Sequence, residues 1–167
     1  TVIIDNGITS IEDFAFIHHI SLTSIRIPDS VVSIGDYAFW ACDNLTSIAI
    51  PDSVTNIGDS AFTFCDSLTS INVDSDNKYY ASEEGVLFDK DKSILIQYPV
   101  GKTTKEYDIP DGVINIGDQA FCSCYRLISI TIPDSVTSIG NSAFSCCFSL
   151  TSITIPISVT SIGYTAF

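Results

Sequence analysis

Cysteine has the most obvious capacity for chemistry in this chain. Four of the six cysteines recur at one position, three residues after an Ala-Phe pair: Cys42, Cys65, Cys124 and Cys147. A tetrahedral zinc site needs paired ligands such as Cys-x-x-Cys, and neither Cys122-Ser123-Cys124 nor Cys146-Cys147 has that spacing. We expect no metal, and a ladder of small buried thiols about 4.8 Å apart. That spacing leaves a Cys42–Cys65 disulfide open.

Nucleophilic catalysis would need a base next to an activated side chain. Only His18 and His19 could act as imidazole bases, and both lie in the most degenerate part of the chain. The serines recur at regular intervals, and no Gly-x-Ser-x-Gly or phosphate-binding glycine motif surrounds them. The sequence therefore predicts no enzyme and no cofactor.

Aspartate oxygens are the ligands that calcium prefers. The aspartates form two recurring sets, one after proline (Asp29, Asp52, Asp111, Asp134) and one after glycine (Asp36, Asp59, Asp118). Neither the EF-hand spacing nor a glycine-rich calcium repeat is present. Turn and helix N-cap roles account for these residues, so we expect no calcium site.

These recurrences reflect one repeat. The intervals from Pro28 to Pro51, from Pro110 to Pro133 and from Pro133 to Pro156 are each 23 residues. Such a period is typical of stacked coils, none of which can bury its apolar face alone. We expect residues 1–167 to form a single solenoid of about seven units of 23 residues, one of them extended to 36 at residues 74–109. Since the repeat is cut at Phe167, we also expect a fragment of a longer protein.

Each unit is predicted to hold three short elements. In residues 45–50, Ile48 and Ile50 face one side and the residues between them the other, which is the period of a strand. Pro51 ends that strand. The β-branched residues 54–57 predict a second short strand, and residues 59–65 predict a helical turn with Asp59 as its N-cap. In this register the aromatic residues that follow alanine should stack as one buried column: Phe16, Phe39, Phe62, Phe121 and Phe144.

The pattern Leu-x-x-Ile-x-Ile-Pro-x-x-Val-x-x-Ile-Gly-x-x-Ala-Phe-x-x-Cys resembles the BspA-type leucine-rich repeats of bacterial surface proteins and some parasitic protists. Close matches begin at Leu22, Leu45 and Leu127, and a truncated one begins at Leu150. With the periodicity, the resemblance implies a β-rich repeat solenoid with a parallel concave sheet, short second strands and short helical turns on the convex side. It also implies a non-catalytic cell-surface or secreted module for adhesion or protein binding, with host or extracellular-matrix proteins as partners. A structural spacer that displays another domain is the alternative.

The 36-residue unit interrupts the repeat. Two apolar runs, residues 85–88 and 93–99, flank the polar residues 89–92, which predicts an inserted β-hairpin. We expect this hairpin to replace the helical turn on the convex side, after which the chain rejoins the concave sheet at Glu106. The insertion is either a variant coil or a ligand-binding projection.

Departures from the repeat pattern supply the candidate protein-binding residues, because consensus residues already hold the coils together. The long unit contributes Tyr79, Tyr80, Glu83, Glu84 and Lys90, and outward strand positions contribute Arg26, Asn72, Glu106 and Asp108. Tyrosine offers large contact area at low entropic cost, which favours the long unit if its tyrosines face solvent.

Composition narrows the partners further. The net charge is −13, from 20 acidic and 7 basic residues, which disfavours nucleic acid and anionic membrane surfaces. The chain is 46% hydrophobic, enough for a folded core, but no apolar run approaches the ~20 residues of a membrane span. We therefore expect no membrane insertion of this fragment. An uncovered last coil at residues 150–167 should either fray or pair end to end with a second copy.

Overall fold

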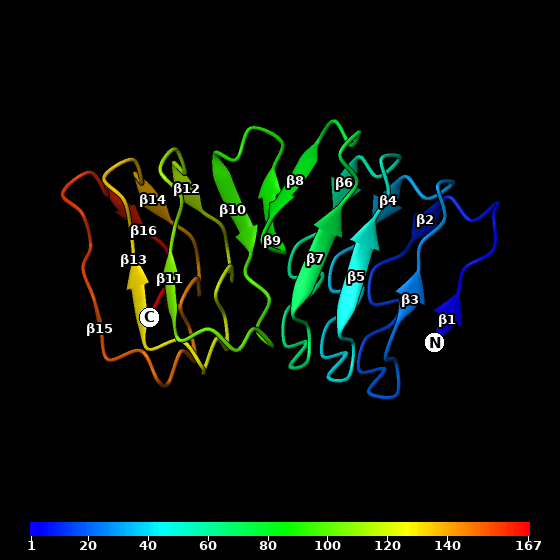
Figure 1. Cartoon of the computed structure of the whole chain (residues 1–167), viewed down its shortest axis with the longest axis horizontal. Coiled ribbons are helices and arrows are strands. Elements are labelled where there is room, and N and C mark those ends of the chain that lie inside the picture. The colour runs from blue at the N-terminus through cyan, green and yellow to red at the C-terminus, as the bar shows by residue number, and fades with distance from the viewer.

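The computed structural model describes all residues from 1 to 167 and contains sixteen short strands and no helix. One strand per coil forms a first-strand ladder along one side of the array (Figure 1). Its members are β1 (Val2–Ile3), β3 (Ile25–Arg26), β5 (Ser47–Ile50), β7 (Ser70–Val73), β11 (Glu106–Asp108), β13 (Ser129–Thr131) and β15 (Ser152–Ile153).

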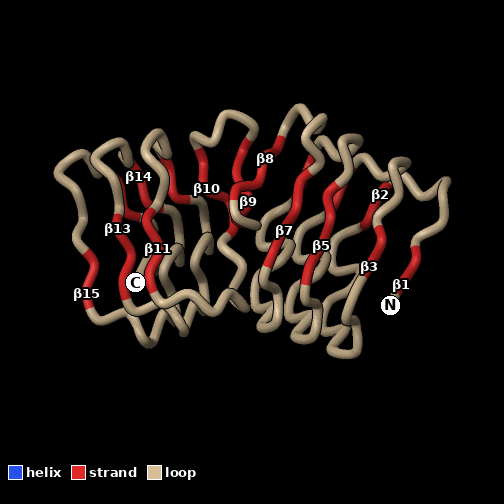
Figure 2. The backbone as a smooth tube through the Cα atoms, viewed as in Figure 1, coloured by secondary structure: helices blue, strands red, loops and turns tan.

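A second-strand ladder runs beside the first, and turns and loops make up the rest of each coil (Figure 2). Its members are β2 (Ser10–Ile11), β4 (Ser33–Ile34), β6 (Asn56–Ile57), β10 (Ile94–Gln97), β12 (Asn115–Ile116), β14 (Ser138–Ile139) and β16 (Ser161–Ile162). Two further strands, β8 (Tyr80–Glu83) and β9 (Val86–Asp89), lie between the N-terminal coils and the C-terminal coils.

Neighbouring coils pair in parallel with the predicted register. Ser47 of β5 pairs with Ser70 of β7, and Ser129 of β13 pairs with Ser152 of β15. Along β5 the burial alternates, so that Ile48 and Ile50 point into the core and Ser47 and Ala49 point outward. The period-2 reading of this strand is confirmed.

The predicted helical turns are wrong. The segment after each glycine is a run of tight turns whose N–H groups alternate between two kinds of acceptor. Trp40 donates to Tyr37 in its own coil at 3.1 Å, whereas Phe39 donates to Ala61 in the next coil at 2.9 Å. Two positions per turn segment adopt positive φ, for example Tyr37 at 55° and Ala41 at 56°. Bonds between coils thus replace the i→i−4 bonds that a helix would require.

The predicted N-cap role of the second aspartate set is wrong for the same reason. These carboxylates connect coils: Oδ1 of Asp36 accepts the N–H of Asp59 at 2.8 Å, and Oδ1 of Asp118 accepts the N–H of Asn141 at 2.7 Å. The preceding glycine permits this close approach, because a Cβ at Gly58 would lie 2.4 Å from Asp36. The carboxylates of Asp36 and Asp118 therefore join neighbouring coils, whereas that of Asp59 accepts no hydrogen bond.

The long unit forms a three-stranded antiparallel meander, β8-β9-β10, that includes the predicted hairpin. Its location differs from the expectation. The carbonyl of Gly85 accepts the N–H of Ile71 in β7, while β10 pairs with β12 in the second-strand ladder. The meander therefore crosses the interior from one ladder to the other, and does not simply replace a turn on the convex side. The chain rejoins the first-strand ladder at β11, as predicted.

Strand β9 divides the core. Val86, Leu87 and Phe88 are fully buried. Leu87 packs into a first cluster of 19 residues, and Val86 and Phe88 pack into a second cluster of 19. Alternate side chains of β9 thus pack into the two core clusters on its opposite faces and join the two halves of the solenoid.

The predicted single aromatic column is consequently two columns. Phe16, Phe39 and Phe62 stack with centroid separations of 5.2 and 5.7 Å. A second stack follows, made of Tyr98, Phe121, Phe144 and Phe167, with separations of 5.2, 5.1 and 5.4 Å. Tyr98 takes the phenylalanine position in the long unit, and the meander lies between the stacks.

Candidate functional site

The residues with the greatest chemical capacity are held in structural roles. The thiols of Cys42, Cys65 and Cys147 donate to backbone carbonyls of the preceding coil at 3.0 to 3.1 Å, and no disulfide is present. The neighbouring Cys42 thiol raises the pKa of Cys65, and burial acts in the same direction. Burial also raises the pKa of Cys147, to about 11. Cys65 and Cys147 are therefore protonated at neutral pH and are poor nucleophiles. The hydrogen bond with the Cys65 thiol lowers the pKa of Cys42.

Histidine and carboxylate chemistry is equally sparse. His18 packs edge-on against Trp40 with a centroid separation of 4.8 Å, and His19 packs against Phe16 at 5.8 Å. No group of three His, Cys, Asp or Glu side chains comes together as a metal site. The chain also forms no helix with the length and hydrophobicity needed to cross a membrane.

The two candidate tyrosines of the long unit have different surroundings. Tyr79 is 52% exposed. Tyr80 is half-buried, its hydroxyl oxygen accepts the Ile57 N–H at 2.8 Å, and desolvation raises its pKa. Tyr80 therefore caps the free edge of β6, whereas Tyr79 is available for contact.

Asn77 positions both tyrosines, and sequence reasoning missed it. This fully buried side chain donates to the carbonyls of Pro51 and Val54 at 2.8 and 2.9 Å, and it accepts the N–H groups of Tyr79 and Tyr80 at 2.8 and 2.9 Å. It lies in the polar run Asp-Ser-Asp-Asn-Lys, which resembles an exposed turn. The one signal in the sequence was that Asp74 replaces the proline found at this position of most other units.

The charged candidates of the long unit are exposed but partly engaged. Glu83 pairs with Lys92 at 2.6 Å, and the carbonyl of Glu84 accepts a hydrogen bond from the Lys102 amine at 2.6 Å. The Lys90 amine donates to the carbonyls of Ser75, at 3.3 Å, and Asn77. Lys90 therefore holds the start of the meander in place. The carboxylate of Glu84 faces solvent without a partner, whereas that of Glu83 is exposed but paired with Lys92.

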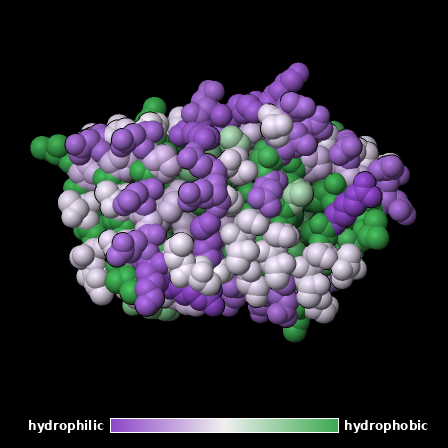
Figure 3. All heavy atoms as spheres, viewed as in Figure 1, coloured by the Kyte–Doolittle hydropathy of each residue, from purple (hydrophilic) through white to green (hydrophobic).

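The outward positions of the first-strand ladder, which we call the strand face, bring other candidates together. Arg26 and Asn72 line one shallow groove of about 430 Å³, which is also lined by Asp29 and Asp74. Over this face the surface is mainly hydrophilic or near neutral, with hydrophobic residues only in small patches (Figure 3).

Glu106 and Asp108 stand on the same face, further along. Both are exposed on β11, where they pair in register with Ser129 and Thr131 of β13. Burial raises the pKa of the intervening Tyr107, and the charges of Glu83 and Glu84 add to that effect. The turn between β8 and β9 therefore lies near β11. We call the four exposed carboxylates of the meander turn and β11 the acidic band: Glu83, Glu84, Glu106 and Asp108.

Comparison with known proteins agrees with this geometry. The family model described as the BspA type leucine rich repeat region matches residues 1–85 and 100–167 in six copies. The fold is a stack of parallel coils, and the chain belongs to the BspA-type leucine-rich repeat family. A search of curated proteins found none similar to the chain.

Several solved structures share the fold. A leucine rich cell surface protein from Faecalibacterium prausnitzii is 36% identical over 96% of this chain, with a TM-score of 0.82. A leucine-rich repeat protein from Eubacterium ventriosum is 31% identical over 96%, with a TM-score of 0.73. The pneumococcal vaccine antigen PcpA, at 24% identity over 96% and a TM-score of 0.88, shows the fold alone. The chain spans about half the length of these proteins, 48%, 55% and 46% respectively.

Proposed function

We propose that the chain is a non-catalytic protein-binding module of a cell-surface or secreted protein, and that it acts in adhesion. One observation carries the proposal. Four exposed carboxylates that depart from the repeat make up the acidic band, two in the meander turn and two on β11. Because the core packs without these carboxylates and only Glu83 has an ion-pair partner, Lys92, the others are available to a binding partner. The relationship to a leucine rich cell surface protein supports a surface location.

The partner that fits this surface is a host or extracellular-matrix protein with a basic patch. The net charge of −13 favours encounter with a positively charged partner surface. The small side chains on the strand face allow a flat partner surface to come close to the strands. Tyr79, Arg26 and Asn72 provide further contacts outside the acidic band, whereas Tyr80 and Lys90 mainly support the meander.

Surface plasmon resonance of the 167-residue chain against purified extracellular-matrix proteins tests the proposal. A variant with Glu83→Gln, Glu84→Gln, Glu106→Gln and Asp108→Asn should bind about tenfold more weakly, since each exposed charge pair contributes about 0.2–1 kcal/mol. The matched control removes the same number of charges at exposed positions outside the strands: Asp52→Asn, Asp91→Asn, Asp111→Asn and Asp134→Asn.

Equal losses in the two variants would remove the acidic band from the binding site. Absence of binding to every matrix protein would favour the structural spacer. Binding should also weaken as salt rises, because exposed charges are screened over about 8 Å at physiological ionic strength.

A further inference from the structure

The stack of coils is incomplete where the long unit follows the coil of β6. Leu95 pairs with Ile116 of the next coil, and Tyr98 stacks on Phe121. Leu95 and Tyr98 are three residues apart in the sequence, whereas Ile116 and Phe121 are five apart. The turn segment of the long unit is thus two residues shorter than its neighbours. A cavity of about 280 Å³ remains between residues 57–62 on one side and residues 96–97 and 117–118 on the other.

One wall of this cavity carries backbone donors that have lost their acceptors. In the preceding coil, the N–H groups of Tyr37 and Phe39 each donate to the next coil at 2.9 Å. Ser60 and Phe62 hold the same two positions in the coil that lines the cavity, and their N–H groups make no hydrogen bond. Since equivalent groups point at the next coil, these two point into the space that the short turn leaves open.

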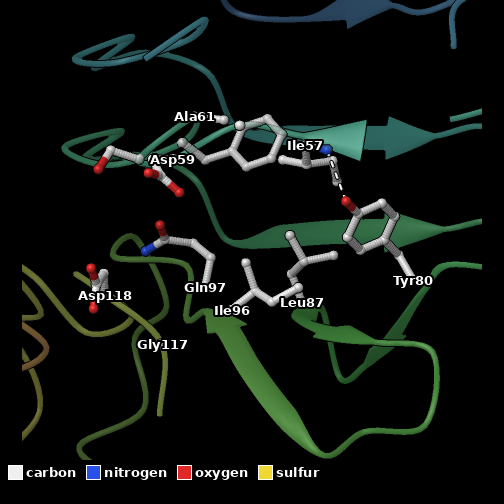
Figure 4. Close-up of a pocket in the computed structure, with 12 residues that line it drawn as sticks. Ile57, Asp59, Ala61, Tyr80, Leu87, Ile96, Gln97, Gly117 and Asp118 are labelled. Carbon is white, nitrogen blue, oxygen red and sulfur yellow. Dashed lines mark hydrogen bonds between the residues drawn. The ribbon is translucent and has the colours of Figure 1, made fainter. Parts of the chain in front are cut away.

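The hydrogen bond from an aspartate carboxylate to the next coil is also missing at this cavity. Asp36 accepts a hydrogen bond from the next coil, but the carboxylate of Asp59 accepts none, because the long unit offers no residue at that position. Across the cavity, the N–H of Asp118 has no carboxylate partner. Asp59 and Asp118 lie around the same opening, with Gln97 between them and Tyr80 at the far end (Figure 4).

We propose that this cavity binds the main chain of a short extended peptide that carries a lysine or arginine. The peptide carbonyl oxygens accept hydrogen bonds from the Ser60 and Phe62 N–H groups, so the peptide substitutes for the missing turn of the coil. Its cationic side chain pairs with the carboxylate of Asp59. Asp59 and Asp118 line the cavity and no lysine or arginine does, so the charge of the site selects a basic ligand. This site borders β6 in the second-strand ladder and does not depend on the acidic band.

Two neighbouring features fit this assignment. Strand β6 is the edge of a three-stranded sheet, and only its Ile57 N–H is capped, by Tyr80. The cavity volume is near the lower end of ligand sites, about 300–1,000 Å³, which suits one or two residues of peptide. A site this small and open should bind with a dissociation constant on the order of 1 mM.

Amide NMR of the full 167-residue chain tests the proposal with acetyl-Gly-Lys-Gly-amide as the probe. The amide signals of Ser60, Phe62 and Asp118 should shift saturably. The analogue acetyl-Gly-Glu-Gly-amide should cause no saturable shift. If n-butylamine bound as tightly as the lysine peptide, recognition of the main chain would be refuted. Failure of the lysine peptide to saturate these signals would refute the site.

A pair of variants isolates the role of Asp59. Asp59→Asn should weaken the lysine peptide about three- to fivefold, the effect of losing one partly exposed charge pair. The matched control is Asp36→Asn, one coil earlier. The fold accommodates asparagine at this position, since Asn141 occupies it and accepts the N–H of Tyr164 at 2.8 Å. Equal weakening by both variants would show that Asp59 does not contact the ligand.

Discussion

At the scale of single residues, this protein uses polar groups to join coils. Asp36, Asp118 and Asn141 each accept an N–H from the following coil. Three of the four ladder thiols donate to the preceding coil: Cys42, Cys65 and Cys147. The bonds to Asp36, Asp118 and Asn141 give protein partners to backbone groups of the turn segments that make no bond within their own coil. Residue types that could have performed chemistry are thereby committed to the stack.

The hydrogen bond of Tyr80 tests whether such polar groups stabilise the stack of coils. Tyr80→Phe removes the oxygen that accepts the Ile57 N–H at 2.8 Å and leaves that donor without a partner. We expect the free energy of unfolding to fall by about 1–2 kcal/mol in urea denaturation. Tyr79→Phe is the control and should change it by less than about 0.5 kcal/mol, because Tyr79 is exposed. A loss in the control as large as in Tyr80→Phe would contradict the capping role.

The cysteines should make stability depend on pH in the alkaline range. The pKa of Cys147 is raised from 9.0 to about 11 by burial, so the unfolded chain loses this proton first as pH rises. The stability that this thiol contributes is fully present below pH 9 and is lost as pH rises through 11. Urea midpoints at pH 8 and at pH 10.5 should therefore differ, and Cys147→Ala should reduce the difference. An unchanged difference would assign the effect to other groups.

The same burial predicts slow labelling. A thiol reagent should modify Cys42, Cys65, Cys124 and Cys147 slowly in the native protein and fully after denaturation, because the first three are buried and Cys147 is half-buried. Mass spectrometry after timed quenching measures this. Rapid native labelling of Cys65 would show that the coils open more readily than their packing indicates.

At the scale of elements, the meander separates the two core clusters and also takes the place of one coil in the second-strand ladder. Its strand β9 supplies core side chains to both halves, and its β10 restores pairing with β12. It does not restore the turn-segment bonds to the coil of β6, so the cavity lies where the two arrays meet.

Phe62 ends the first aromatic stack at this junction and is 2% exposed. Phe62→Ala should cost about 3–5 kcal/mol, since it removes a buried ring and leaves a void. Melts followed by circular dichroism would measure the loss. Phe148→Ala is the control, because Phe148 is 85% exposed. A Phe62→Ala variant as stable as the control would overturn the stacking register.

Hydrogen exchange should expose the interrupted bonding directly. Amides of Ser60 and Phe62 lack acceptors, whereas those of Tyr37 and Phe39 are bonded to the next coil. We expect the first pair to exchange about tenfold faster or more, because an unbonded amide needs no opening step beyond solvent access. Equal protection of the two pairs would mean that the junction holds acceptors other than those described.

At the scale of the whole molecule, the last coil of this chain is exposed on its outer side. Ile162, Tyr164 and Phe167 are 52%, 82% and 56% exposed. We expect residues 150–167 to exchange hydrogen faster than residues 110–132 if the chain is monomeric, or two copies to pair end to end. Light scattering over a concentration series distinguishes the two. A monomer with uniform protection would contradict both outcomes.

Much of this architecture follows from sequence. A 23-residue period fixes the parallel register, since identical positions must stack if each coil is to bury its apolar face. Alternation in residues 47–50 fixes which side chains point inward. The outward positions of Arg26, Asn72, Glu106 and Asp108 follow from the same alternation.

Tertiary structure decided the rest, because it depends on partners distant in the chain. The turn segment has a composition that permits a helix, yet its N–H groups find acceptors in the next coil, and that competition excludes the helix. The local sequence suggests that Asn77 and Tyr80 are surface residues. Hydrogen bonds to residues 51–57 instead hold Asn77 buried and Tyr80 half-buried. The meander crosses the core since Val86, Leu87 and Phe88 alternate between two apolar clusters, and a local pattern cannot reveal which clusters lie on either side.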